Sequence, residues 1–211
     1  MSVFSSLKAG AIALVFVATA AQADFIAPAL TLDNTTGLAL ANPPFTMGWR
    51  FSAKVPIAVL ALGVFDDSGD GLVDSYPTCI FSAAGNPVIC TTVDAGTADA
   101  LVGQFRYRGV KKTLAARIYQ IGSLYRTGDD PLVFTSYAIN VTTAPQIGFI
   151  SGEFFSGSAL TNPTGSGGPD PGYFGPNFLF TTPEVMPEPL SAALTGAGLV
   201  LLLTGRRRRA R

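Results

Sequence analysis

The sequence contains no histidine. This absence excludes catalytic sites in which an imidazole acts as the general base, and it excludes metal centres that need a histidine ligand. A Gly-x-Ser-x-Gly motif is also absent, which removes the nucleophile elbow of the α/β-hydrolases. Charged residues make up only 13% of the 211 residues, so few side chains remain for acid–base chemistry.

Carboxylates are the remaining candidates for catalysis. Two carboxyl groups can hydrolyse a glycosidic bond, and a pair could be assembled from Asp129, Asp130, Glu153 and Asp170. Nothing in the spacing of these residues singles out one pair. We therefore expect a protein that is not an enzyme, with a glycan-acting hydrolase as the weaker alternative.

The charges are distributed unevenly along the chain. The 14 basic and 14 acidic residues cancel, but five of the basic residues lie in the last six positions. All acidic residues fall between Asp24 and Glu188. Without its two ends, the chain keeps eight basic residues against 13 or 14 acidic ones, depending on where the tail begins. The middle of the chain is therefore acidic, which excludes nucleic acid as its partner.

The N-terminus has the pattern of a secretory signal peptide over residues 1–23. Lys8 precedes an uncharged apolar run at 9–20, and Ala21 and Ala23 form a small-residue cleavage box before Asp24. The run is shorter than the ~20 residues that a membrane-spanning helix needs. We expect signal peptidase to cleave before Asp24, and an uncleaved anchor is the alternative.

The C-terminus carries a three-part pattern within residues 183–211. Pro187, Glu188 and Pro189 are followed by an uncharged apolar stretch at 190–204 and then by an arginine cluster. The cluster consists of Arg206, Arg207, Arg208 and Arg209, with Arg211 beyond it. As a helix the stretch would be ~22 Å long, short for a ~30 Å hydrocarbon core. We expect a short transmembrane helix with its arginines in the cytoplasm and the preceding chain outside.

This tail resembles the PEP-CTERM protein-sorting signal, whose three parts it matches in order. The resemblance implies a Gram-negative bacterium that makes exopolysaccharide. It also implies that exosortase, a membrane-embedded cysteine protease, recognises and removes the tail after transient anchoring in the inner membrane. The mature protein would then be at the cell surface or in the extracellular matrix. A plain C-terminal membrane anchor is the alternative.

Between the two ends, residues 24–182 predict a single all-β domain. Short apolar or alternating segments bounded by glycine and proline favour an antiparallel β-sandwich or jelly roll. The predicted strands are 47–52, 57–65, 78–81, 88–93, 104–110, 117–125, 132–141, 147–150 and 178–181. Residues 163–175 hold eight glycines or prolines and predict a long loop.

This middle part also resembles a small domain of unknown function that often precedes PEP-CTERM tails. The resemblance is carried by short motifs in order: Ala61–Asp66, Gly69–Leu72, Asp94–Thr97, Phe105–Tyr107, Tyr119–Gly122 and Tyr173–Phe178. It implies an exported β-sandwich domain and brings no assigned activity.

The two cysteines flank a predicted hairpin. If the turn is centred between Ala84 and Gly85, Cys79 and Cys90 face each other within disulfide reach. Because an exported protein enters an oxidising compartment, we expect a structural disulfide there. Two free buried thiols are the alternative.

One acidic loop is a candidate calcium site. Asp66, Ser68, Asp70 and Asp74 occupy positions 1, 3, 5 and 9 of a loop with Gly71 at position 6, as in calcium-binding loops. The position of the final glutamate of an EF-hand is held by Pro77. The alternative is an acidic, glycine-rich turn between two strands, and no other cofactor is expected.

Aromatic side chains are the candidates for sugar binding. A module that binds the secreted polysaccharide would stack exposed rings on sugar rings, and the candidates are Trp49, Tyr107, Tyr125, Tyr173 and Phe174. For each of them, membership of the hydrophobic core is the favoured interpretation. The expected function is a non-enzymatic surface or matrix protein, with carbohydrate binding as the alternative.

Overall fold

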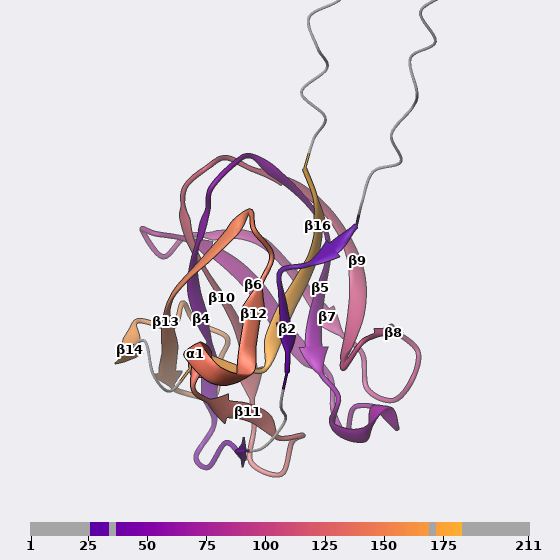
Figure 1. The fold of residues 1–211 in the computed structure, drawn as a ribbon. Coiled ribbons are helices and arrows are strands. Elements are labelled where there is room, and N and C mark those ends of the chain that lie inside the picture. The colour runs from indigo at the N-terminus through magenta and orange to yellow at the C-terminus, as the bar shows by residue number, and fades with distance from the viewer. Residues whose placement is uncertain (1–25, 34–36, 169–171, 183–211) are drawn as a thin grey trace, which may run out of the picture.

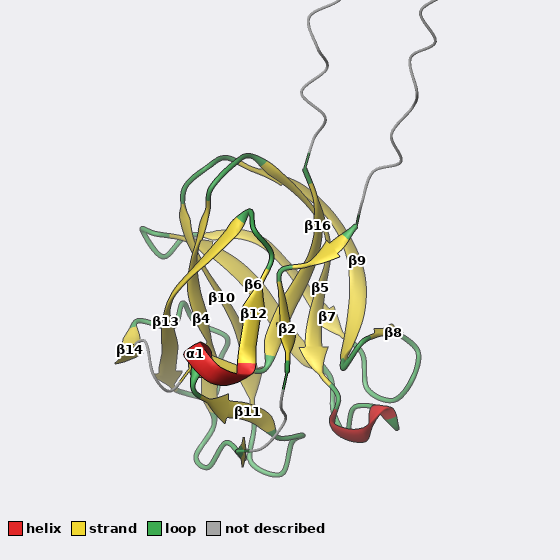
Figure 2. Ribbon diagram, viewed as in Figure 1, coloured by secondary structure: helices red, strands yellow, loops and turns green. Residues whose placement is uncertain are grey.

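The computed structural model describes residues 26–33, 37–168 and 172–182. Its strands pair antiparallel throughout, which confirms the predicted all-β class. Within the described ranges, the helical segments are a 3-10 turn, η1 (Asp67–Gly69), and one short helix, α1 (Tyr137–Asn140) (Figure 2).

Two larger sheets carry most of the strands (Figure 1). The five-stranded sheet has the order β1 (Ala27–Pro28), β16 (Pro176–Thr181), β5 (Ile57–Phe65), β9 (Phe105–Leu114) and β8 (Ala100–Val102). The six-stranded sheet has the order β14 (Gly165–Gly168), β13 (Ile147–Ser156), β4 (Phe45–Ala53), β10 (Ile118–Tyr125), β6 (Tyr76–Ser82) and β7 (Pro87–Val93).

Two smaller sheets complete the fold. One has the order β15 (Gly172–Phe174), β11 (Leu132–Thr135) and β3 (Leu38–Ala39), and the other pairs β12 (Val141–Thr143) with β2 (Leu30–Leu32). Most of the predicted strands overlap observed ones, because their alternating or continuous apolar patterns correspond to sheet faces that are buried.

The prediction of one strand over residues 132–141 was wrong. The chain leaves β11 at Thr135, makes the single turn α1 and then enters β12. Asn140 stabilises this turn, because its backbone N–H donates to Ser136 O at 3.2 Å and its side-chain amide donates to the Thr135 hydroxyl at 2.6 Å. These local hydrogen bonds offer the backbone an alternative to continuing the strand.

The prediction of a long loop over residues 163–175 was also wrong. This segment contains β14, which pairs with β13, and β15, which pairs with β11. Strand pairing uses backbone groups, so glycine-rich segments can join a sheet whose other strands are already in place.

One aromatic cluster joins the two larger sheets. The indole of Trp49 on β4 stacks on Phe178 of β16, with ring centroids 6.0 Å apart and planes 13° apart. Phe51 lies 4.9 Å from the same Phe178 ring, and the indole N–H donates to Pro176 O at 2.8 Å. All three rings are buried, so the core holds the sheets together through both packing and a satisfied polar group.

We predict that Gly48→Ala destabilises the fold, because a Cβ at this position would collide with the carbonyl oxygen of Ile121 on the neighbouring strand. Overpacking of this kind costs ~1–3 kcal/mol or more. The measurement is the urea midpoint of unfolding, with Gly109→Ala in β9 as the control because a Cβ there meets nothing within 4 Å. Equal midpoints for the two variants would contradict the close approach of β4 and β10.

Candidate functional site

The predicted disulfide is confirmed. Cys79 on β6 lies directly opposite Cys90 on β7, with the Cα atoms 4.1 Å apart and the sulfurs bonded. The hairpin turns at Gly85, whose φ of 83° is the left-handed conformation that glycine favours, and Ser82 N donates to Asn86 O across the turn at 2.8 Å. The predicted cysteine register is thus correct, although the turn itself is centred on Ala84, and a register shift between Ile80 and Phe81 brings the two cysteines opposite each other.

The predicted calcium loop is organised around an arginine. Asp66 is buried, and its carboxylate accepts from Arg106 Nε at 2.6 Å and from Gly71 N at 3.2 Å. The Arg106 guanidinium also donates to the carbonyl oxygens of Gly69 and Asp99, at 2.8 and 3.1 Å. A guanidinium thus supplies the positive charge that the loop motif suggested for a metal.

The four predicted calcium ligands Asp66, Ser68, Asp70 and Asp74 are not gathered into one ligand set. Asp74 pairs instead with Arg126 at 3.4 Å and accepts from Ser75 N at 2.7 Å. In the described part of the chain, no group of three or more Asp, Glu, Cys or His side chains is placed to hold a metal ion. The loop motif could not predict that Asp66 pairs with an arginine, because Arg106 lies 40 residues further along the chain.

The candidate catalytic carboxylates are engaged in the structure of the loops. Asp130 accepts from the Tyr76 hydroxyl at 2.9 Å and from Val73 N at 2.7 Å, while Asp129 accepts from Arg126 N at 2.6 Å. Burial raises the pKa of Asp129 above its ordinary value, and nearby Asp74 and Asp130 add to the rise against the opposing Arg126.

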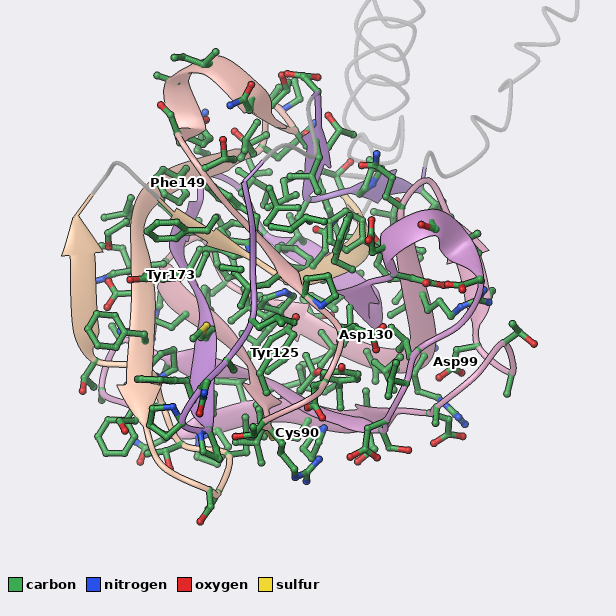
Figure 3. All side chains as sticks on the ribbon, turned by 90° about the horizontal axis from the view of Figure 1, so that it is seen from below. Cys90, Asp99, Tyr125, Asp130, Phe149 and Tyr173 are labelled. Carbon is green, nitrogen blue, oxygen red and sulfur yellow. A yellow bond between two sulfur atoms is a disulfide. The ribbon has the colours of Figure 1, made fainter. Side chains whose placement is uncertain are left out.

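Two tyrosines lie beside this carboxylate pair. Burial raises the pKa of both Tyr76 and Tyr125 well above the ordinary value, with the charge of Asp130 contributing in each case. Tyr125 and Asp130 lie in the same part of the molecule in Figure 3. The hydrogen bonds between Asp130 and the Tyr76 hydroxyl tie the loop at 126–131 to β6 and so stabilise the fold.

The other two candidates do not join this pair. Glu153 lies on β13, is 3% exposed and accepts from the Ser151 hydroxyl at 2.5 Å. Asp170 falls outside the residues that the structure describes. Among the three predicted carboxylates that the structure describes, the geometry therefore brings together Asp129 and Asp130 and leaves Glu153 apart.

Most of the predicted sugar-stacking residues belong to the core. Trp49, Tyr107, Tyr125 and Phe174 are all at most 5% exposed, so their rings are not free to stack on a ligand. For these four the structure agrees with the favoured interpretation, membership of the core, which aromatic content alone could not separate from an exposed binding face. Tyr173 differs from them, because its side chain is partly exposed.

Tyr173 belongs to a row of four aromatic side chains, three of which, Phe45, Phe154 and Tyr173, also pack against a buried core cluster. Its ring lies 5.1 Å from Phe134 and 5.7 Å from Phe154, and Phe154 in turn lies 6.2 Å from Phe45. Phe134 is 38% exposed, and the other three side chains are partly exposed. We call Phe45, Phe134, Phe154 and Tyr173 the aromatic row.

Four different strands supply the aromatic row. Phe134 on β11 is paired in register with Tyr173 on β15, while Phe154 comes from β13 and Phe45 from the start of β4. The labelled Tyr173 shows the position of the row in Figure 3. Sequence reasoning missed three members of the row, because they become neighbours only when the small sheet packs against β4 and β13.

The aromatic row can form apolar contacts with a ligand. Contiguous exposed apolar surface commonly marks an interaction site, and aromatic rings present large rigid faces for such contacts. Partial burial raises the pKa of Tyr173 above its ordinary value. The neutral hydroxyl can both donate and accept a hydrogen bond. The row is the candidate functional site of the described domain.

The predicted processing signals fall outside the residues that the structure describes. They comprise the cleavage residues Ala21, Ala23 and Asp24 and the sorting residues Pro187, Glu188, Pro189, Arg206, Arg207, Arg208 and Arg209. Among the residues described, no helix has the length and apolar character needed to cross a membrane.

We predict that reduction of the disulfide lowers stability. The bridge closes a loop with a sequence separation of 11, and the chain-entropy model gives such a loop a contribution of ~2–3 kcal/mol. Urea unfolding with and without a thiol reductant measures this shift. A double Cys79→Ala/Cys90→Ser variant serves as the control and should unfold at one midpoint in both conditions. A wild-type midpoint that ignores the reductant would contradict the prediction.

Comparisons of the chain with protein families, with curated proteins and with solved structures find no match.

Proposed function

We propose that the chain is an exported, non-enzymatic protein of the cell surface or exopolysaccharide matrix. In this proposal signal peptidase removes residues 1–23, and exosortase recognises the Pro187-Glu188-Pro189 motif and removes the tail. The observation that carries the proposal is the Cys79–Cys90 disulfide, because such bridges persist in oxidising compartments outside the cytoplasm. It agrees with the two sequence signals at the ends of the chain.

We also propose which kind of all-β fold the domain has. We interpret the domain as a β-sandwich of the jelly-roll kind, with the two larger sheets as its layers. The support is the shared aromatic core of Trp49 and Phe178, together with connections that pass from one sheet to the other between β4 and β5, β5 and β6, and β9 and β10. Such all-β domains are common scaffolds for binding at their surfaces.

A non-enzymatic role is supported by what the carboxylates do. Asp130 holds the Tyr76 hydroxyl and Val73 N, and Asp66 holds the buried guanidinium of Arg106. These groups are committed to loop structure, so a hydrolytic mechanism would have to break contacts that stabilise the fold.

Carbohydrate binding is the second candidate function, and the aromatic row is the observation that favours it. Phe134 and Tyr173 offer neighbouring, partly exposed rings on the outer face of the small sheet, with Phe154 and Phe45 continuing the surface. We propose that the apolar faces of sugar rings pack against these side chains. The matrix polysaccharide would then be the ligand of an otherwise structural protein.

The processing proposal predicts the mass of the mature protein isolated from its native host. The mass should correspond to a chain that begins at Asp24 and lacks the arginine cluster. Intact-protein mass spectrometry measures both cleavage points at once. A mass that includes Arg211 would exclude removal of the tail.

The binding proposal predicts that Phe134→Ala and Tyr173→Ala each weaken binding to a polysaccharide identified on a glycan array. We expect a loss of about fivefold, or ~1 kcal/mol, as an aromatic contact contributes. Phe155→Ala is the control, because Phe155 is 39% exposed and is not among the ring contacts of the row.

Equal losses for the row variants and for Phe155→Ala would contradict a specific role for the aromatic row. An assay for released reducing ends, run on the same polysaccharide, separates binding from hydrolysis. Release of sugar ends by the wild-type chain would overturn the non-enzymatic assignment.

A further inference from the structure

The charges of the described domain are separated between its two ends. Residues 100–128 contain six basic residues and no acidic residue, although the chain between its terminal signals is acidic. Antiparallel pairing divides these basic residues between opposite ends of the strands. The basic residues at one end form ion pairs with aspartates of the domain, whereas those at the other end form none with the described residues.

One end of the domain is acidic. The pairs Phe65↔Phe105 and Tyr76↔Val93 bring together the loops that hold most of the aspartates. These are Asp66, Asp67, Asp70, Asp74, Asp94, Asp99, Asp129 and Asp130. Figure 3 looks at the molecule from below, toward the end in which Asp99 and Asp130 lie.

The arginines at the acidic end are all paired. Arg106 contacts Asp66 at 2.6 Å, Arg126 contacts Asp74 at 3.4 Å, and Arg108 contacts Asp99 at 2.8 Å and Asp94 as well. Their positive charge is used within the fold. Its eight aspartates outnumber its three arginines, so the net charge of this end is negative, although Asp66, Asp99, Asp129 and Asp130 are buried.

The opposite end is basic. Register pairs Ile57↔Leu114 and Ser52↔Ile118 place the β4–β5 turn beside the β9–β10 turn, and Ala53 N donates to Arg117 O at 2.9 Å. The cations here are Lys54, Lys111, Lys112 and Arg117. We call this surface the basic end, and it lies at the top of Figure 1.

Three cations of the basic end are available to a ligand. Lys111, Lys112 and Arg117 are exposed, and none forms an ion pair with any acidic residue in the described ranges. Lys54 differs, because its ammonium group donates to Pro145 O at 3.0 Å. Uncompensated charges at one end raise the local concentration of anions around it.

A groove of about 650 Å³ is lined by one of these cations, Arg117, and Lys111 and Lys112 lie on β9 just before its lining residue Thr113. One wall is the tip of the uncharged β6–β7 hairpin, at residues 82–84 and Val88, and the other is the β9–β10 connection at residues 113–119. Arg117 and the 39% exposed Ile118 line the groove, which therefore offers both a positive charge and an apolar surface.

We propose that this groove at the basic end binds an anionic polysaccharide, a polymer whose sugars carry carboxylate groups. Inside the groove a carboxylate would pair with Arg117 and the apolar faces of the sugars would lie on Ile118 and Val88, while carboxylates further along the polymer would pair with the exposed Lys111 and Lys112 beside it. A hollow lined by both a cation and apolar side chains suits a sugar polymer better than the flat surface of a lipid bilayer. Repulsion between its carboxylates and the aspartates keeps the same polymer away from the acidic end. The domain would therefore bind the polymer only through its basic end.

This inference deepens the proposed matrix role by naming a polymer class and a second surface, and it can fail separately from that role. A polymer held by the basic end need not touch the aromatic row. Phe134→Ala should therefore leave anionic binding unchanged, whatever its effect on other glycans.

The test measures binding of alginate, a polyuronate, to the full chain in a nonionic detergent, with neutral dextran as the comparison polymer. We expect alginate alone to bind, with an affinity that falls as sodium chloride is added. Lys111→Gln/Lys112→Gln should weaken binding about fivefold, the effect of two exposed charge contacts, and Arg117→Gln should weaken it further. Lys111→Arg/Lys112→Arg keeps the charge and should retain binding.

The control for net charge is Val73→Glu/Ile139→Glu, which makes the same change of two charges at exposed positions outside the groove. An equal loss in this control would overturn the groove and leave a net-charge effect. Unchanged binding in the lysine double variant would also overturn it. Binding to phosphatidylglycerol mixed micelles without binding to alginate would assign the basic end to anionic lipid instead.

Discussion

The buried contact between Arg106 and Asp66 organises one whole end of the domain. The Arg106 guanidinium joins the end of β5 to the start of β9. It also donates to the carbonyl oxygens of Gly69 and Asp99, which belong to two different loops. Without Asp66, Arg106 would be a buried charge with no partner, which is strongly unfavourable. The ion pair and the loops that Arg106 holds therefore stabilise each other. The same contact explains why an acidic loop with calcium-like spacing is a structural corner.

Antiparallel registration then determines what each surface can bind. Strand ends that meet at one end of the sheets gather the aspartates and pair the nearby arginines, while the other end keeps Lys111, Lys112 and Arg117 without described acidic partners. The aromatic row arises in the same way, from four strands that are distant in sequence. Two separated surfaces of different chemistry support the proposed role in holding polymers.

Much of the fold was predictable because its signals are local. The continuous apolar run of β5 and the alternation in β4 mark buried faces, and the spacing of Cys79 and Cys90 about a tight turn predicts their register. The turn at α1 and the strands β14 and β15 were not predictable in this way. They depend on Asn140 hydrogen bonds and on pairing with strands formed elsewhere in the chain.

The sequence by itself determined the all-β class, the disulfide and the absence of any histidine chemistry, since each follows from composition or from neighbours within one hairpin. Only the tertiary structure decided which aromatic rings are buried, that Arg106 satisfies Asp66, and that Arg117 and Ile118 line a groove. The physical reason is that burial and charge pairing depend on contacts between strands far apart in the chain. Such contacts leave no periodic pattern in the residues that make them.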